Sequence, residues 1–568
     1  MFFLRSKRAG RVAACTALAL SAGMLLTGTA SADTPAPRPS IEKKTPAFTP
    51  PKLTLPKQDG ARAGIAAAEA ASLPLSDLNG DGIEDLIFRA LDGQLYTDVP
   101  SADPTVPAPA FELHRLDVAK DIIPIGNQGG DTTEPEVLVL SENGTLTLYR
   151  DADPTGTPYD SVVGGGWQIY NKVTSPGDVN NDGRADVLAR TQDGQLFLYL
   201  ATGDLSRPLG TRISVGSGWG VYDQLVGAGD VTGDGRADLY TRDTAGNLYF
   251  YTGTGSTTAP FSGRKLIGGG WGAYNQILPV GNGDLLARDN AGTLYFYVSN
   301  SNGTLAGRQQ VSAVGDWAGI SQFALAGSNP YTGKEGVIAG TSGGSLYWYG
   351  NDTTGKLGAR QILDAPGSWA GLKVSHLSSM NGDGFSDIAI TFSDGELWIE
   401  GSPIGYGWNA YNSLVAPGDL SGDGKGDLLA RDGSGVLWIY RGNGKGDALS
   451  GRVRVGSGWG AYNKILGAGD YTGDGRTDVL ARTTGGDLYL HPGSGNATTP
   501  FKPRVKIGSG WGTYKQLAAP GDLNADGKAD LLGVTSGGDL YRYLGTSPSK
   551  FSARAKIGYG FQAYNSMS

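Results

Sequence analysis

The chain has 568 residues, of which 39% are hydrophobic and 18% are charged, so it carries enough apolar side chains to bury a core. Its net charge of −8 argues against nucleic acid or an anionic membrane surface as a partner. The 92 glycines exceed twice the average share of about 7%, without a collagen-like period, which favours short strands joined by tight turns.

Residues 1–32 have the features of a secretory signal peptide. A basic segment (5–11) precedes an apolar segment (12–26), and Ala30–Ala32 is a small-residue cleavage site. A lipoprotein is the alternative, because Val12–Cys15 resembles a lipidation box, but Cys15 lies near the start of the apolar segment rather than at its end. We therefore expect a secreted, extracellular protein with no cysteine after cleavage and no membrane span.

Residues 33–60 are rich in proline and predict an extended linker. The remainder, 61–568, repeats itself: Ile213–Leu225, Val453–Ile465 and Val505–Leu517 share a Gly-Ser-Gly-Trp-Gly-x-Tyr core, and an acidic loop follows each copy. Most copies are 48–52 residues apart, and one step, from 379 to 419, is shortened to 40 as if a hairpin were trimmed. A fixed period of this length indicates a repeat architecture.

Each copy contains four short segments rich in β-formers, separated by glycine turns. This pattern predicts an all-β fold, a β-propeller array of about ten four-stranded repeats; a β-solenoid is the rival. The last segment, Ile557–Asn565, could complete the first blade of a single ring. Because ten blades exceed the usual number of about 4–8, two smaller propellers dividing near 310–330 are the alternative.

Six acidic loops fit the pattern D-x-[NST]-x-D-G-x-x-D, and a seventh has Ser379 at its first position. Calcium takes about 6–8 oxygen ligands, and side chains at positions 1, 3, 5 and 9, with the carbonyl of position 7, can converge on one ion. The predicted metal ligands are Asp77, Asn79, Asp81, Asp85, Asp178, Asn180, Asp182, Asp186, Asp230, Thr232, Asp234, Asp238, Asn381, Asp383, Asp387, Asp419, Ser421, Asp423, Asp427, Asp470, Thr472, Asp474, Asp478, Asp522, Asn524, Asp526 and Asp530.

These loops are not EF-hands, because position 12 is never glutamate and the flanks are strand-like. Metal-free Asp-Gly turns are the simpler interpretation of any one loop. Six copies with three carboxylates each favour a cation, since the uncompensated carboxylates would repel one another. Calcium is preferred over magnesium, which demands a stricter octahedral geometry.

The loops and their placement resemble the FG-GAP (VCBS-type) repeats of integrin α-chain propellers and of secreted bacterial proteins, over about residues 73–568. The resemblance implies structural calcium within the blades, about six to seven Ca²⁺ ions in all. The FG-GAP dipeptides themselves are only loosely present, as in Pro176-Gly177. The copies near 127, 280 and 328 depart from the loop pattern and are expected to hold no metal.

One aromatic residue recurs in nearly every copy: Trp167, Trp219, Trp271, Trp317, Trp369, Trp408, Trp459, Trp511 and Phe561. Packing between blades is the preferred interpretation, and a ring of sugar-stacking sites, as in tachylectin-like propellers, is the alternative.

No catalytic role is expected. The three histidines, His114, His376 and His491, fall at unrelated positions of the repeat, and no metalloprotease, nucleophile-elbow or P-loop motif is present. The sequence thus predicts a monomeric, non-catalytic binding or adhesion module for an extracellular protein or glycan ligand. A carbohydrate-binding lectin and a propeller-based extracellular hydrolase are the alternatives.

Overall fold

The computed structural model describes residues 48–56, 74–79, 84–99, 110–111, 118–129, 134–152, 159–326, 334–467, 469–546 and 549–568. They belong to one compact unit, Ser40–Ser568. The predicted signal peptide (1–32) lies outside the described residues, as does the predicted linker apart from 48–56. Among the residues described, there is no helix long and apolar enough to cross a membrane.

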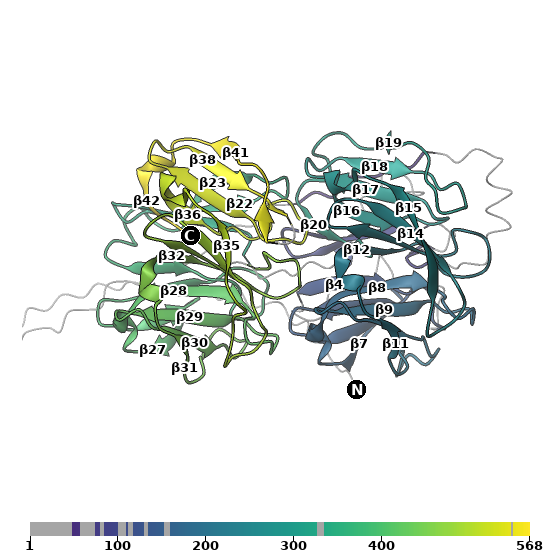
Figure 1. The fold of residues 1–568 in the computed structure, drawn as a ribbon, viewed down its shortest axis with the longest axis horizontal. Helices are drawn as coiled ribbons and strands as arrows, with labels where there is room; N and C mark the ends of the chain where they lie inside the picture. Colours follow the sequence, from purple (N-terminus) through teal and green to yellow (C-terminus); the bar gives the residue numbers. More distant parts are fainter. Residues whose placement is uncertain are drawn as a thin grey trace, which may run out of the picture. The chain divides into compact units, whose positions relative to one another are not determined.

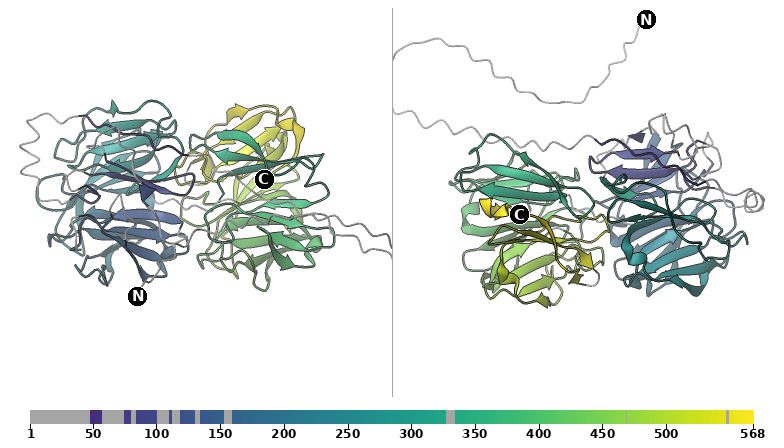
Figure 2. Two further views of the ribbon diagram at one scale, coloured as in Figure 1. Left: turned by 180° about the vertical axis from the view of Figure 1, so that it is seen from behind. Right: turned by 90° about the horizontal axis from the view of Figure 1, so that it is seen from above.

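Within this part of the chain the strands form ten four-stranded antiparallel sheets, which confirms the predicted all-β propeller repeats. The sheets fall into two sets of five, shown in purple to teal and in green to yellow (Figures 1 and 2). We call them the first ring and the second ring.

The first ring consists of five sheets: β20 (Ile320–Phe323), β1 (Leu86–Ala90), β2 (Leu95–Asp98), β3 (Ala110–Phe111); β4 (Ala119–Pro124), β5 (Val137–Ser141), β6 (Leu146–Arg150), β7 (Tyr159–Gly164); β8 (Tyr170–Gly177), β9 (Asp186–Thr191), β10 (Leu196–Tyr199), β11 (Ile213–Gly216); β12 (Tyr222–Gly227), β13 (Leu239–Asp243), β14 (Leu248–Gly253), β15 (Phe261–Gly268); and β16 (Tyr274–Pro279), β17 (Leu285–Asp289), β18 (Leu294–Tyr297), β19 (Gln309–Gln310).

The second ring consists of β42 (Tyr564–Met567), β21 (Gly336–Thr341), β22 (Leu346–Asn351), β23 (Leu357–Ile362); β24 (Lys373–His376), β25 (Ile388–Thr391), β26 (Leu397–Ile399), β27 (Ser402–Gly405); β28 (Tyr411–Gly418), β29 (Asp427–Asp432), β30 (Leu437–Arg441), β31 (Val453–Gly456); β32 (Tyr462–Leu466), β33 (Val479–Thr483), β34 (Leu488–His491), β35 (Val505–Gly508); and β36 (Tyr514–Ala518), β37 (Leu531–Thr535), β38 (Leu540–Tyr543), β41 (Ala555–Gly558). A small extra hairpin joins β39 (Gly545–Thr546) to β40 (Lys550–Phe551).

Each ring is completed by a strand from its own C-terminal end. Strand β20 pairs with β1, and β42 pairs with β21. The end of the chain therefore does not complete the first blade, as a single ring would require. Innermost strands also bond across the joins: Gln322 Nε2 on β20 donates to Lys120 O on β4 at 2.7 Å, and Gln516 Nε2 on β36 donates to Tyr564 O on β42 at 2.8 Å.

A short 3₁₀ turn precedes the innermost strand of most blades. It begins at the recurring aromatic residue: η1 (Trp167–Ile169), η2 (Trp219–Val221), η3 (Trp271–Ala273), η4 (Trp408–Ala410), η5 (Trp459–Ala461), η6 (Trp511–Thr513) and η7 (Phe561–Ala563). The residue before each turn is a glycine in the left-handed region, for example Gly458 with φ of 88°. A side chain is strained in this conformation, which explains why glycine precedes the aromatic residue in every such copy.

An arginine connects successive blades, a feature that the sequence analysis did not identify. Arg482 Nη1 on β33 donates to Trp511 O at 3.1 Å and to Tyr514 O at 2.7 Å, while its Nε donates to Asn463 Oδ1 at 3.0 Å. Equivalent bonds are made by the arginines that share its position, Arg190, Arg242, Arg288 and Arg431, except that Asp223 replaces the asparagine as the partner of Arg242. These bonds satisfy carbonyls at a turn that no strand partner reaches.

Part of the predicted linker packs against the first ring. Leu53 is fully buried in the core beside Phe88, its N–H donates to Asp98 Oδ2 at 2.6 Å, and Phe48 lies against Phe88 and Tyr96. Residues 48–56 are therefore anchored to the propeller by apolar burial and by a hydrogen bond.

The shortened step after residue 379 keeps all four strands of its blade. Only two residues separate β26 from β27, whereas 13 separate β10 from β11 in a full-length copy. The trimmed connection is thus between the third and fourth strands.

Candidate metal loops

Six of the seven acidic loops join the innermost strand of a blade to its second strand, and the loop that begins at Asp77 precedes the second strand β1. The loop that begins at Asp178, for example, joins β8 to β9, and the loop that begins at Asp470 joins β32 to β33. Of the predicted ligands, only Asp81 lies outside the described residues. The sheets therefore hold these six loops at both ends, in the same place in every blade that carries one.

The carboxylate at position 1 accepts backbone N–H groups of its own loop. Asp230 Oδ1 accepts from Gly233 and Asp234 at 2.8 and 3.0 Å, and Oδ2 accepts from Gly235 at 2.6 Å. Position 5 behaves similarly, since Asp234 Oδ1 accepts the N–H of Arg236 at 3.1 Å. A carboxylate has about four acceptor sites, so these bonds leave lone pairs for a cation.

Position 9 has a structural role that its sequence position did not reveal. Asp478 is fully buried; its Oδ2 accepts the N–H of Tyr471 at 2.9 Å, and its Oδ1 accepts the N–H of Gly493 at 2.7 Å. Asp186, Asp238 and Asp530 make the same bond, and each ties its loop to the end of the third strand. The copy near 280, which has no acidic loop, keeps this group: Asp284 is buried and accepts the N–H of Ser299 at 2.6 Å. Position 9 therefore stabilises the blade independently of any metal.

Three buried oxygens in these loops have no hydrogen-bond partner among the residues described. Two belong to position 3: Asn524 Oδ1, in a side chain only 1% exposed, and Thr232 Oγ1. The third is Asp427 Oδ1 at position 9. A buried oxygen without a partner is costly, and a cation in the loop would satisfy it.

The carboxylates of one loop raise one another's pKa. Burial, with added repulsion from Asp182 and Asp178, raises the pKa of Asp186 to about 7. Burial, with the charges of Asp419 and Asp423, does the same for Asp427. The buried carboxylate of Asp530 is raised well above its ordinary pKa, with repulsion from Asp522 and Asp526 after burial.

Among the described residues, no three His, Cys, Asp or Glu side chains come together closely enough to form a metal site by themselves. The absence of such a cluster does not conflict with the repulsion between the carboxylates of one loop. The predicted set of metal ligands also includes Asn, Ser or Thr at position 3 and a backbone carbonyl at position 7. Carboxylate, amide, hydroxyl and carbonyl oxygens are the ligands that calcium prefers, so the donor chemistry of the loops fits this ion.

Without calcium, the protein is expected to be more stable at about pH 5 than at about pH 8. The folded-state pKa of Asp186 and of Asp427 is about 7, above the ordinary value of 3.8. The folded state therefore binds more protons than the unfolded state between these values, and stability falls as pH rises through that range. Melting temperatures in chelator at the two pH values test this; a higher melting temperature at pH 8 would contradict it.

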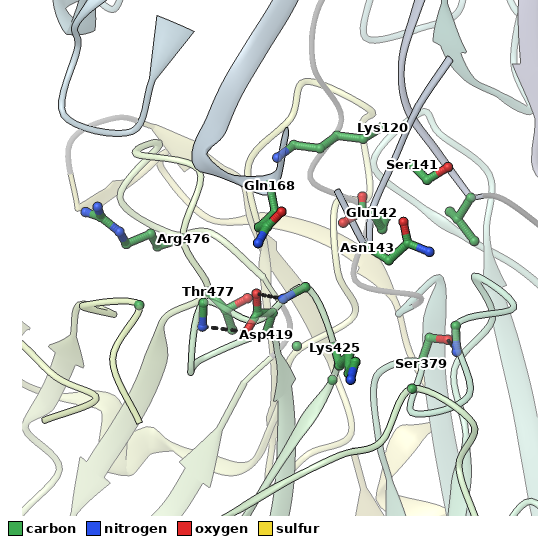
Figure 3. A pocket seen from close by; sticks show the side chains of 18 of the residues that line it. Lys120, Ser141, Glu142, Asn143, Gln168, Ser379, Asp419, Lys425, Arg476 and Thr477 are labelled. Atoms are coloured by element: carbon green, nitrogen blue, oxygen red, sulfur yellow. Dashed lines mark hydrogen bonds between the residues drawn. The ribbon is translucent and has the colours of Figure 1, made fainter. Parts of the chain in front are cut away.

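Three loops of the second ring, which begin at Ser379, Asp419 and Asp470, open onto one cavity of about 720 Å³ (Figure 3). Lys120, Gln168 and Arg476 also line it. The volume suits a small ligand.

The recurring aromatic residues are mostly buried, which supports their interpretation as packing groups. Trp317 is fully buried, while Trp167 and Trp219 are only half-buried. Trp459, 7% exposed, lies against Tyr462, His491 and Phe501, with ring centres 5.4, 4.5 and 5.5 Å away. In most blades a tyrosine takes the place of His491 and pairs its hydroxyl with a second tyrosine, as in Tyr222 and Tyr251 at 2.6 Å.

The two described histidines lie in separate blades. His376 is on β24, with Nδ1 3.1 Å from Ser568 O, and His491 is on β34, with Nε2 3.1 Å from Tyr462 OH. Burial lowers the pKa of His491 to about 4, so it is a neutral packing group at physiological pH. His114 lies outside the described residues.

Comparison with solved structures finds matches of low similarity. A lectin from Agrocybe aegerita that recognises non-reducing terminal N-acetylglucosamine is 14% identical, over 81% of this chain and 96% of its own, with a TM-score of 0.19. The BP39L lectin from Burkholderia pseudomallei is 14% identical, over 69% and 99%, with a TM-score of 0.23. A luciferin-regenerating enzyme is 11% identical, over 47% and 78%, with a TM-score of 0.27. No curated protein sequence matches.

The family comparison identifies the loops directly. The model of the FG-GAP-like repeat matches residues 178–241, 419–481 and 470–533. Each matched segment begins at the first aspartate of a predicted loop and runs into the following strands. The chain therefore contains three FG-GAP-like repeats, set among the four-stranded antiparallel sheets of a β-propeller-type fold.

Proposed function

We propose that the protein is a secreted, calcium-binding propeller that serves as a non-catalytic binding or adhesion module for an extracellular protein or glycan. FG-GAP-like repeats fit such a module. The observation that carries the calcium assignment is the pair of unpartnered position-3 oxygens, Asn524 Oδ1 and Thr232 Oγ1, beside carboxylates that raise one another's pKa. Calcium supplies a positive charge that satisfies both features at once.

In the calcium-bound protein, positions 1 and 9 of each loop would hold the ion from two sides. Position 1 is oriented by the loop N–H groups, as in Asp470, whose Oδ1 accepts from Gly473 at 2.6 Å. Position 9 is fixed by the neighbouring strand end, as in Asp478 with Gly493. The ion would thus connect the two ends of a loop that already closes on itself, and the blades would present a rigid surface to a partner.

Loop variants test the assignment. Replacing Asp474 with Ala is expected to cost more stability in calcium than in chelator, because it removes a ligand as well as local hydrogen bonds. Asp383→Ala should show a smaller difference, because Ser379 replaces the first carboxylate of its loop. Asp284→Ala is the matched control: it should destabilise equally under both conditions, since its copy has no acidic loop. Equal losses with and without calcium for all three would refute the assignment.

A lectin is the second candidate, and exposed aromatic residues favour it. Tyr406 and Tyr559 are 71% and 83% exposed, on the Gly-x-Gly turns beside Trp408 and Phe561. An exposed aromatic face on a rigid turn can stack on a sugar ring. A glycan array with the full, calcium-loaded chain tests this, with Tyr559→Ala as the variant that should lose binding without losing stability.

A further inference from the structure

The axis of the second ring contains a cavity with a strongly basic lining. Its volume is about 390 Å³, and it lies among the inner strands β24, β28 and β32. Lys334, Lys373, His376, Arg431 and Lys464 line it, and no Asp or Glu side chain does so among the described residues. Ser568 also lines the cavity.

Two of the cations that line this cavity, Lys464 and Arg431, donate to uncharged oxygens. Lys464 Nζ donates to Met567 O at 3.2 Å, and Lys334 Nζ donates to His376 O at 3.2 Å. Arg431 Nε donates to Asn412 Oδ1 at 2.7 Å. By contrast, Arg242 in the first ring pairs with the carboxylate of Asp223 at 2.9 Å. Burial and the nearby Arg482 lower the pKa of Lys464 to about 8, which reflects the cost of holding its charge there.

The first ring has different side chains at the positions that correspond to Lys464. There the residue two places after the start of each inner strand is Asp121, Lys172, Gln224, Gln276 or Gln322. Burial lowers the pKa of Lys172 to about 8, and the nearby carboxylate of Asp121 acts in the opposite direction. The glutamines bond from one strand to the next, as in Gln224 Nε2 to Asn275 O at 2.8 Å and Gln276 Nε2 to Ser321 O at 2.9 Å. Side chains and a charge pair thus occupy the axis of the first ring.

In the second ring the corresponding residues are Ser375 on β24, Ser413 on β28, Lys464 on β32, Gln516 on β36 and Ser566 on β42. Gln516 keeps the bond from one strand to the next, to Tyr564 O. The three serines leave space, and the lysine brings a charge without the aspartate that accompanies it in the first ring. Cations that surround one space repel one another, and an anion in that space would offset the repulsion.

We propose that this axial cavity binds an oxyanion group (sulfate, phosphate or carboxylate), either as a free ion or as the charged group of an acidic saccharide. The volume suits a single sugar residue, and Lys464, Arg431 and Lys373 supply the charge-assisted donors. The proposal gives a ligand class to the binding role proposed above, but it uses none of the residues of the acidic loops.

Titration calorimetry on the full chain with calcium, at constant ionic strength, tests the proposal with sodium sulfate, glucuronate and glucose as probes. We expect sulfate or glucuronate to bind once per chain and glucose not to bind. Tighter binding of glucuronate assigns the site to an acidic saccharide, and binding of sulfate alone assigns it to a free anion. Binding of none of the probes, or equal binding of glucose, would overturn the proposal.

Variants locate the site. Lys464→Gln, which introduces the first ring's residue type, should weaken anion binding about tenfold or more. Ser413→Gln should weaken it by filling the cavity. Lys506→Gln, which removes an exposed lysine that pairs with Asp487, is the control and should leave binding unchanged. Anion binding that Lys464→Gln and Ser413→Gln leave intact would overturn the proposal.

Stability provides a second readout. The anion should raise the melting temperature of the natural chain but not that of Lys464→Gln. This variant should itself be no less stable, because it removes a partly desolvated charge. The loop variants report on calcium binding, and the axial variants report on anion binding. The failure of one proposal is therefore distinguishable from the failure of the other.

Discussion

Replacing Trp459 with alanine is expected to lower the free energy of unfolding by about 3–5 kcal/mol, the usual cost of truncating a buried tryptophan. Its ring is 7% exposed and packs in a core with Leu429, Ile439 and Val479. The backbone of the same residue is held between blades, since its N–H donates to Gly435 O and its carbonyl accepts from Arg431. Chemical denaturation of the two proteins in calcium measures the loss.

Trp219→Ala is the matched control, because Trp219 occupies the same place in its blade but is only half-buried. A smaller loss is expected there, since less apolar area leaves water on folding. If Trp459→Ala kept its stability but lost binding to a glycan found by array, the packing interpretation would be wrong and the lectin would become the better reading.

Removal of calcium is expected to produce the largest loss of stability. Sites of the extracellular kind bind with a Kd of about 10⁻⁴ to 10⁻³ M. At about tenfold excess of calcium, one site adds about 1.4 kcal/mol, and six independent sites would add about 8 kcal/mol. The loss arises because the carboxylates, already raised in pKa by burial and by one another, would face each other without a counter-ion.

Scanning calorimetry in calcium, in magnesium and in chelator measures this effect. Magnesium should protect far less, because it requires a stricter octahedron and keeps its water ligands. An unchanged melting curve in excess chelator would show that the loops are ordinary turns closed by their own N–H groups.

The repeat period and the composition of the strands were sufficient to predict the all-β propeller repeats. The spacing of the loops predicted their place in each blade, because loop and strand recur together in every full copy. The pairs of strands that complete each ring could not be deduced in the same way. Any inner strand can pair with any second strand of the same pattern, so only the structure shows that β42 pairs with β21 and β20 with β1.

The roles of individual loop residues were only partly predictable. Position 9 was interpreted as a ligand, and the sequence could not show that Asp478 also accepts N–H groups from two segments. Asp284, which keeps this role in a copy without an acidic loop, was the available signal. The arginine connection between blades likewise recurs in the sequence, but its acceptors are backbone carbonyls about 30 residues away, which no residue pattern marks.

The number of calcium ions bound per chain tests the central claim most directly. Equilibrium dialysis of the full protein followed by metal analysis should find six to seven ions, one for each loop with the complete pattern and one for the loop of Ser379 if that loop binds. The triple variant Asp182→Ala, Asp234→Ala, Asp474→Ala should bind three fewer. A chain that binds no calcium at millimolar concentration, or a triple variant with the same count, would contradict the account.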